Sequence, residues 1–239
     1  KQDGLDEEIK GGVVYVLDST ITYYPKLLAD ENLVVPILQR YIAFAVASYQ
    51  ADVPSDDYET GIMANICTAY RENPQFVEAV WTAIQGITST DEGKYVSMLI
   101  LNYLFTPDED FFYDNMDDIV DLMADSLTTQ SAATYEAAIK CLTKFFSEFR
   151  EASEYAEVFV PILIENVKSR VSISTIEALA CILKSSDCTD PFFNDVYQIL
   201  MALLSQAPPE FHKSIIYAIS MLASRSEICI NEHYQQIMG

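Results

Sequence analysis

The chain has 239 residues, half of them apolar, and its 36 acidic residues against 14 basic ones give a formal net charge of −22. This much apolar sequence can bury a sizeable core and argues against disorder. The charge argues against nucleic acid or an anionic membrane surface as a partner, because both are bound by basic faces. A basic protein or peptide fits the charge best; the plainer interpretation, that acidity only keeps a large apolar surface soluble, stays open.

Apolar residues recur at helical spacing almost throughout the chain, and strand signals are nearly absent. Short polar breaks such as PSDD (54–57) and TPDED (106–110) separate the apolar stretches. Pro161 should kink its helix or mark a delayed start. The pattern predicts an all-α fold of about twelve helices, at residues 12–24, 33–50, 57–72, 74–87, 91–105, 109–127, 131–149, 152–169, 172–185, 190–206, 208–224 and 229–238.

The helices repeat in pairs. One helix of each pair carries a block of small and aliphatic residues: SMLILNYL (97–104), EAAIKCL (136–142), EALACIL (177–183) and YAISMLA (217–223). Equivalent positions Met98, Ala137, Ala178 and Ala218 lie 39, 41 and 40 residues apart. A period near 40 residues with two helices per unit is typical of HEAT or armadillo repeats. It predicts a single α-solenoid segment over 1–239, built from about five to six helical hairpins; an irregular helical bundle is the alternative.

Signals of catalysis and secretion are missing from the sequence. There is no glycine-rich phosphate loop and no hydrolase or metalloprotease motif, and neither His212 nor His233 has a metal ligand at the required spacing. Five cysteines form no C-x-x-C pair, and there is no glycosylation sequon, signal peptide or apolar run of membrane-spanning length. We therefore expect a reduced, intracellular protein that is not an enzyme and takes no cofactor or metal. The chain starts at Lys1 rather than at a methionine and ends in the helical pattern EHYQQIMG, so we expect a fragment of a longer chain.

One stretch stands out as a candidate binding site. DNMDDIVDLMADSL (114–127) carries five aspartates, although like charges four residues apart disfavour a helix. On a helix, with about 100° per residue, the apolar side chains fall on one side. The carboxylates of Asp114, Asp117, Asp118, Asp121 and Asp125 form an acidic ridge on the other side. The ridge would attract a lysine- or arginine-rich segment of a partner; the alternative is that it is only a solvated face.

The order of these helices resembles the importin-β (karyopherin-β) family of nuclear transport receptors, especially its importin-5-like branch. The resemblance runs from about residue 62 to 224 and rests on IMANICTAYRENPQFVEAVWTAI with Trp81, GKYVSMLILNYLF, YAEVFVPILIENV, STIEALACILKSSD, PFFNDVYQILMALL and KSIIYAISMLASRSE. SAATYEAA, VSISTIEA and FHKSIIYA lack the arginine typical of HEAT turns, so the similarity is to a divergent member.

The resemblance implies a monomeric receptor without enzymatic activity that moves between cytoplasm and nucleus. Such a receptor binds basic nuclear-localisation segments on an acidic inner surface and releases them when Ran-GTP binds the receptor. The alternative is a HEAT or armadillo scaffold subunit of another complex, associated with a phosphatase, the cytoskeleton or chromatin.

Overall fold

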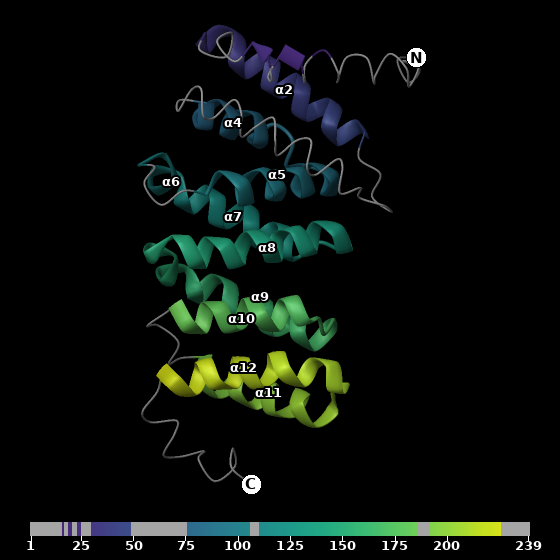
Figure 1. Cartoon of the computed structure of the whole chain (residues 1–239), viewed down its shortest axis with the longest axis vertical. Coiled ribbons are helices and arrows are strands. Elements are labelled where there is room, and N and C mark those ends of the chain that lie inside the picture. The colour runs from purple at the N-terminus through teal and green to yellow at the C-terminus, as the bar shows by residue number, and fades with distance from the viewer. Residues whose placement is uncertain are drawn as a thin grey trace. The chain divides into compact units, whose positions relative to one another are not determined.

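The computed structural model describes residues 16, 19–20, 23–24, 30–48, 76–105, 110–185 and 192–225. In these ranges the regular structure is entirely helical, and no strand is formed (Figure 1). The prediction of an all-α fold is therefore confirmed. The helices expected at 57–72 and 229–238, and most of the one at 12–24, lie outside the described residues.

The described part of the chain holds ten α-helices and one 3-10 helix, compared with about twelve helices expected for the whole chain. Their bounds agree with the expected ranges to within a few residues. They are α2 (Glu31–Ser48), α4 (Phe76–Gln85), α5 (Asp91–Leu104), α6 (Asp110–Asp114), α7 (Met116–Leu127), α8 (Ala132–Glu148), η2 (Arg150–Tyr155), α9 (Ala156–Ser169), α10 (Ile173–Ser185), α11 (Phe193–Gln206) and α12 (Pro209–Arg225).

The helix expected over 109–127 is divided in the structure into α6 and α7. The break falls at Asn115, whose φ of −113° and ψ of 14° depart from helical values. Its side-chain Nδ2 donates to the Phe111 carbonyl oxygen at 2.9 Å, in competition with the backbone of the helix. As a result, Asp114 belongs to α6, while the other four aspartates of the acidic ridge belong to α7.

The sequence left open whether Pro161 kinks its helix or marks a delayed start, and the structure places Pro161 inside α9, after that helix has begun. Residues 150–155 form the 3-10 helix η2, and the α-helical part, α9, begins only at Ala156. Pro161 therefore lies near the beginning of α9, where the missing N–H removes one backbone hydrogen bond.

The chain divides into two compact units, Lys1–Ala138 and Ile139–Gly239. In the first unit, α2 contacts α4 and α5, and α5 also contacts α7. The core of this unit is built around α5, where the SMLILNYL block supplies the fully buried side chains of Met98 and Ile100. This central position explains why α5 carries so few charged residues after its first turn.

In the second unit, α10 contacts α9, η2 and α12, and α12 also contacts α11. Ala178 of α10 and Ala218 of α12 are both fully buried. These alanines come from successive small-residue blocks of the repeat, and small side chains let the two helices approach closely. Burial of the aliphatic side chains around them stabilises the unit by roughly 25 cal/mol for each Å² of apolar surface removed from water.

Aromatic side chains at the start of the second unit are part of its core. Phe145 packs against Phe149 with ring centroids 5.6 Å apart, and Phe146 meets Phe159 edge to face at 5.8 Å. All four side chains are buried. They tie the end of α8 to α9, and such pairs add to the stabilisation that burial alone provides.

Candidate functional site

Helix α7 has the two faces that the sequence predicts. Its buried side is formed by Met116, Ile119, Val120, Met123 and Leu127. Asp117, Asp118, Asp121 and Asp125 are exposed on the other side, and Asp114 is exposed on α6. Packing of the apolar side onto the unit offsets the cost of the like charges, a few tenths of a kcal/mol for each pair four residues apart.

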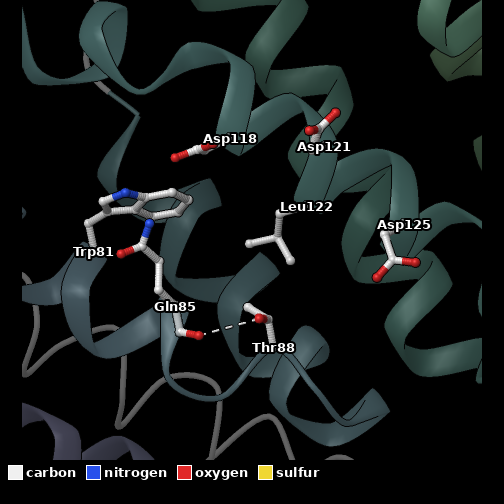
Figure 2. A pocket seen from close by; sticks show the side chains of 7 residues that line it. All are labelled: Trp81, Gln85, Thr88, Asp118, Asp121, Leu122 and Asp125. Carbon is white, nitrogen blue, oxygen red and sulfur yellow. Dashed lines mark hydrogen bonds between the residues drawn. The ribbon is translucent and has the colours of Figure 1, made fainter.

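A pocket of about 430 Å³ lies beside the exposed face of α7 (Figure 2). Helix α4 and the turn after it form one wall, and α7 forms the facing wall. The lining residues are Trp81, Gln85, Thr88, Asp118, Asp121, Leu122 and Asp125. Three of the five aspartates of the predicted ridge thus meet in one pocket. Asp114 and Asp117 do not line it.

The tight turn between α4 and α5 positions the end of this pocket where Thr88 lies. Thr90 caps α5, because its Oγ1 accepts a hydrogen bond from the Gly93 backbone N–H at 3.1 Å. Gly93 is required by the close approach of the turn: a Cβ on residue 93 would lie 1.8 Å from the Ile87 carbonyl oxygen. The turn also brings Thr88 to the pocket, where its hydroxyl donates to the Gln85 carbonyl oxygen at 3.4 Å (Figure 2).

One lysine, at the start of α5, forms an ion pair with the acidic ridge. Lys94, in the first turn of α5, places its Nζ 2.7 Å from Oδ2 of Asp125. The Lys94 side chain is only 17% exposed, but that of Asp125 is 60% exposed, so water screens the pair and its contribution to stability is small. In the described part of the chain, no lysine or arginine is paired with Asp118 or Asp121. The pocket therefore keeps an excess of negative charge.

Trp81 closes the pocket on the side of α4. Its side chain is 6% exposed and meets Phe111 edge to face, with ring centroids 6.4 Å apart. The indole Nε1–H is buried and has no hydrogen-bond acceptor among the residues that the structure describes. An unsatisfied buried donor costs about 1–3 kcal/mol, and this donor lies beside a pocket from which a bound ligand could supply the acceptor. In Figure 2 the nitrogen lies on the edge of the ring that faces the side of Asp118.

A second pocket, of about 520 Å³, lies within the second unit. It is lined by Thr143, Phe146 and Ser147 of α8, by Glu177, Cys181 and Lys184 of α10, and by Tyr217 of α12. Burial raises the pKa of the Cys181 thiol above its ordinary value, against the smaller opposing effects of Ser147 and Lys184. The thiol is thereby kept protonated near neutral pH, unlike the thiolate of a nucleophilic cysteine.

The histidines and the acidic side chains form no metal-binding group in the described part of the chain. His212 lies with its Nε2 3.0 Å from the Ala207 carbonyl oxygen, whereas His233 lies outside the described residues. Over the ranges that the structure describes, no three His, Cys, Asp or Glu side chains are arranged to hold a metal ion. Within the same ranges, no helix has the length and apolar character needed to cross a membrane.

Sequence reasoning missed two members of the site. Trp81 was singled out only through the family resemblance, and nothing in its spacing placed it opposite the aspartates of α7. Lys94 was not singled out, because it lies far from Asp125 in sequence and no helical spacing joins them. The signal that could have found both is tertiary: it requires knowing that α4 and the start of α5 pack beside α7.

Fold and site together define an all-helical chain of two compact units with an acidic, tryptophan-walled pocket in the first. No model of a known protein family matches the chain, and no curated protein is significantly similar to it. The resemblance to importin-β receptors therefore rests on the sequence pattern alone.

Proposed function

We propose that this chain is a protein-binding segment of an α-solenoid and that it binds a basic segment of a partner protein along the exposed carboxylates of α7. The repeat spacing of 39, 41 and 40 residues supports the solenoid. It is also supported by the contact of α10 with α12, since these helices carry successive small-residue blocks. Solenoids commonly use such stacked helices as extended binding surfaces.

The observation that carries the proposal is the pocket between α4 and α7. Asp118 and Asp121 line it, and no described cation is paired with either. A net charge of −22 adds a long-range field of the same sign, which raises the encounter rate with cations. A lysine- or arginine-rich segment supplies the complementary charge in an extended form that can follow the helix.

The finer proposal is that the segment belongs to a divergent importin-β-like nuclear transport receptor. Its partner would then be a nuclear-localisation-type cargo, Ran-GTP, or both, and it would work as a monomer in cytoplasm and nucleus without enzymatic activity or a cofactor. The sequence resemblance supports this finer statement, together with the acidic ridge.

A scaffold subunit of another complex, associated with a phosphatase, the cytoskeleton or chromatin, is the second candidate. It is favoured by the pocket of the second unit and by exposed apolar side chains on α12, where Ile216 is 56% and Tyr217 is 48% exposed. A scaffold needs a second binding surface of this kind, and exposed large apolar side chains commonly mark one.

The experiment that separates these candidates uses the full chain immobilised on beads and a purified basic nuclear protein. Binding is measured with and without Ran loaded with a non-hydrolysable GTP analogue. Salt-sensitive binding of the basic protein that is lost when Ran is added supports the transport receptor. Binding that Ran leaves unchanged supports the scaffold. If the basic protein does not bind at low salt, the proposed use of the α7 carboxylates is wrong.

A further inference from the structure

We propose that the pocket between α4 and α7 selects an arginine side chain of the bound segment. The guanidinium lies against the exposed part of the Trp81 indole and donates to the carboxylates of Asp118 and Asp121. This inference rests on the proposed function, since it names the side chain that the acidic site takes from a basic partner segment. It concerns the first compact unit alone.

The two walls of the pocket offer different chemistry to a cation. Asp118 and Asp121 lie three residues apart on α7 and are therefore neighbours on its surface. The opposite wall includes the indole of Trp81, of which only a small part is exposed (Figure 2). A guanidinium is planar and carries donors around its edge, so it can stack on an aromatic ring and bind carboxylates at the same time. A lysine ammonium is a point charge that interacts with the carboxylates equally well, but its interaction with the aromatic ring is weaker.

The ion pair of the third carboxylate, Asp125, restricts where an incoming cation can bind in the pocket. Asp125 is already paired with Lys94 at 2.7 Å, whereas Asp118 and Asp121, at the Trp81 end of the pocket, have no cation partner among the described residues. One incoming cation is drawn to Asp118 and Asp121 rather than distributed along the whole of α7. The carboxylates of Asp118 and Asp121 and the Trp81 indole thus lie together in the part of the pocket that Lys94 does not neutralise.

The indole N–H is a second, independent indication that a ligand belongs here. Trp81 lines the pocket, is more than nine-tenths buried, and has no acceptor for its Nε1–H in the described part of the chain. A peptide brings backbone carbonyl oxygens along with its basic side chain, whereas a free metal cation or polyamine brings no such acceptor. Gln85 and Asp118, which line the pocket on either side of the indole in Figure 2, are exposed. A rotation of either side chain makes room for that carbonyl.

Trp81 also provides the measurement, because it is the only tryptophan of the chain. Its fluorescence therefore reports on this wall alone in the intact protein. The full chain is titrated with a short arginine-rich peptide, and separately with a peptide of the same length and charge in which every arginine is lysine. We expect both to bind in a salt-sensitive way, the arginine peptide about tenfold more tightly. Only the arginine peptide should change the Trp81 emission strongly.

Variants test the role of each wall, with labelled peptides and fluorescence anisotropy as the readout. Trp81→Leu should remove the preference for arginine and keep the salt-sensitive binding of both peptides. Asp118→Asn with Asp121→Asn should weaken both peptides. The control, Glu151→Gln with Glu154→Gln, removes the same charge from exposed positions of the second unit and should leave both affinities unchanged.

The outcomes separate this inference from the function on which it rests. Equal affinity for the two peptides, with unchanged Trp81 emission, overturns the arginine pocket and leaves basic-segment binding standing. Absence of salt-sensitive binding of either peptide overturns both. If Trp81→Leu does not fold, the comparison of the two peptides on the unaltered chain still decides the question.

Discussion

Replacing Gly93 with alanine tests how closely α5 packs against the turn that forms the Thr88 end of the pocket. The added Cβ would lie 1.8 Å from the Ile87 carbonyl oxygen, 2.8 Å from the Ile87 carbonyl carbon and 3.2 Å from Oγ1 of Thr90. The first two atoms belong to the backbone, so the turn or the start of α5 must move by more than an ångström to reach ordinary contact. That movement also disturbs the hydrogen bond from the Gly93 N–H to Thr90.

The magnitude follows from three terms. Overpacking of this kind costs about 1–3 kcal/mol, and loss of the N-cap costs about 1 kcal/mol. Alanine recovers about 1 kcal/mol over glycine within a helix. We therefore expect Gly93→Ala to destabilise the first unit by about 1–3 kcal/mol. The matched control is Gly86→Ala, whose Cβ would meet only the Ala83 carbonyl oxygen, at an ordinary 3.4 Å, so its stability should be unchanged or slightly raised.

Urea unfolding followed by Trp81 fluorescence measures this difference, since the tryptophan lies in the first unit and reports on it locally. A chain of two compact units can unfold in parts, so the urea midpoint of the Trp81 transition is compared between variants. If Gly93→Ala and Gly86→Ala unfold at the same urea concentration as the parent, the close approach of the turn to α5 is not a feature of the folded protein.

Three further predictions concern charge and burial. Lys94→Gln should lower the free energy of unfolding by less than about 1 kcal/mol, because Asp125 is mostly exposed, and should raise the affinity for a basic peptide by freeing that carboxylate; urea unfolding and anisotropy measure the two effects. Neutralising Asp118, Asp121 and Asp125 together as asparagines should change the urea stability by less than about 1 kcal/mol, since relief of like-charge repulsion offsets the lost ion pair and helix-dipole interaction. Burial raises the pKa of the Cys141 thiol far above its ordinary value, so at mildly alkaline pH it should stay protonated and resist iodoacetamide until the protein unfolds, as mass spectrometry would show. Rapid alkylation of the folded protein at Cys141 would contradict its burial.

The faces of α7 could be predicted because they follow from local geometry. The apolar positions from Met116 to Leu127 recur with the helical period, and a helix with that pattern buries the apolar side in almost any compact fold. The break at Asn115 could not be predicted in the same way. It depends on a hydrogen bond from the Asn115 side chain to the Phe111 carbonyl oxygen, and a periodicity analysis does not include that competition.

The pocket itself could not be predicted because its parts come from separate elements. Trp81 and Asp118 belong to different helices, and so do Lys94 and Asp125. These residues lie close together because of the turn between α4 and α5. The only sign of the close packing of that turn in the sequence is the glycine at position 93. Degenerate helical repeats carry few such marks, and so the ridge was visible from the sequence while its opposite wall was not.

The most direct test of the account compares two triple variants in equilibrium binding of a labelled arginine-rich peptide. One is Asp118→Asn, Asp121→Asn and Asp125→Asn; the control is Glu151→Gln, Glu154→Gln and Asp195→Asn, all exposed in the second unit. Exposed ion pairs contribute up to about 1 kcal/mol each, so the α7 variant should bind about tenfold more weakly, with a flatter dependence on salt. The control should bind as the parent does. Unchanged affinity of the α7 variant, or an equal loss in both, would show that the carboxylates of α7 are a solvated face and not a binding site.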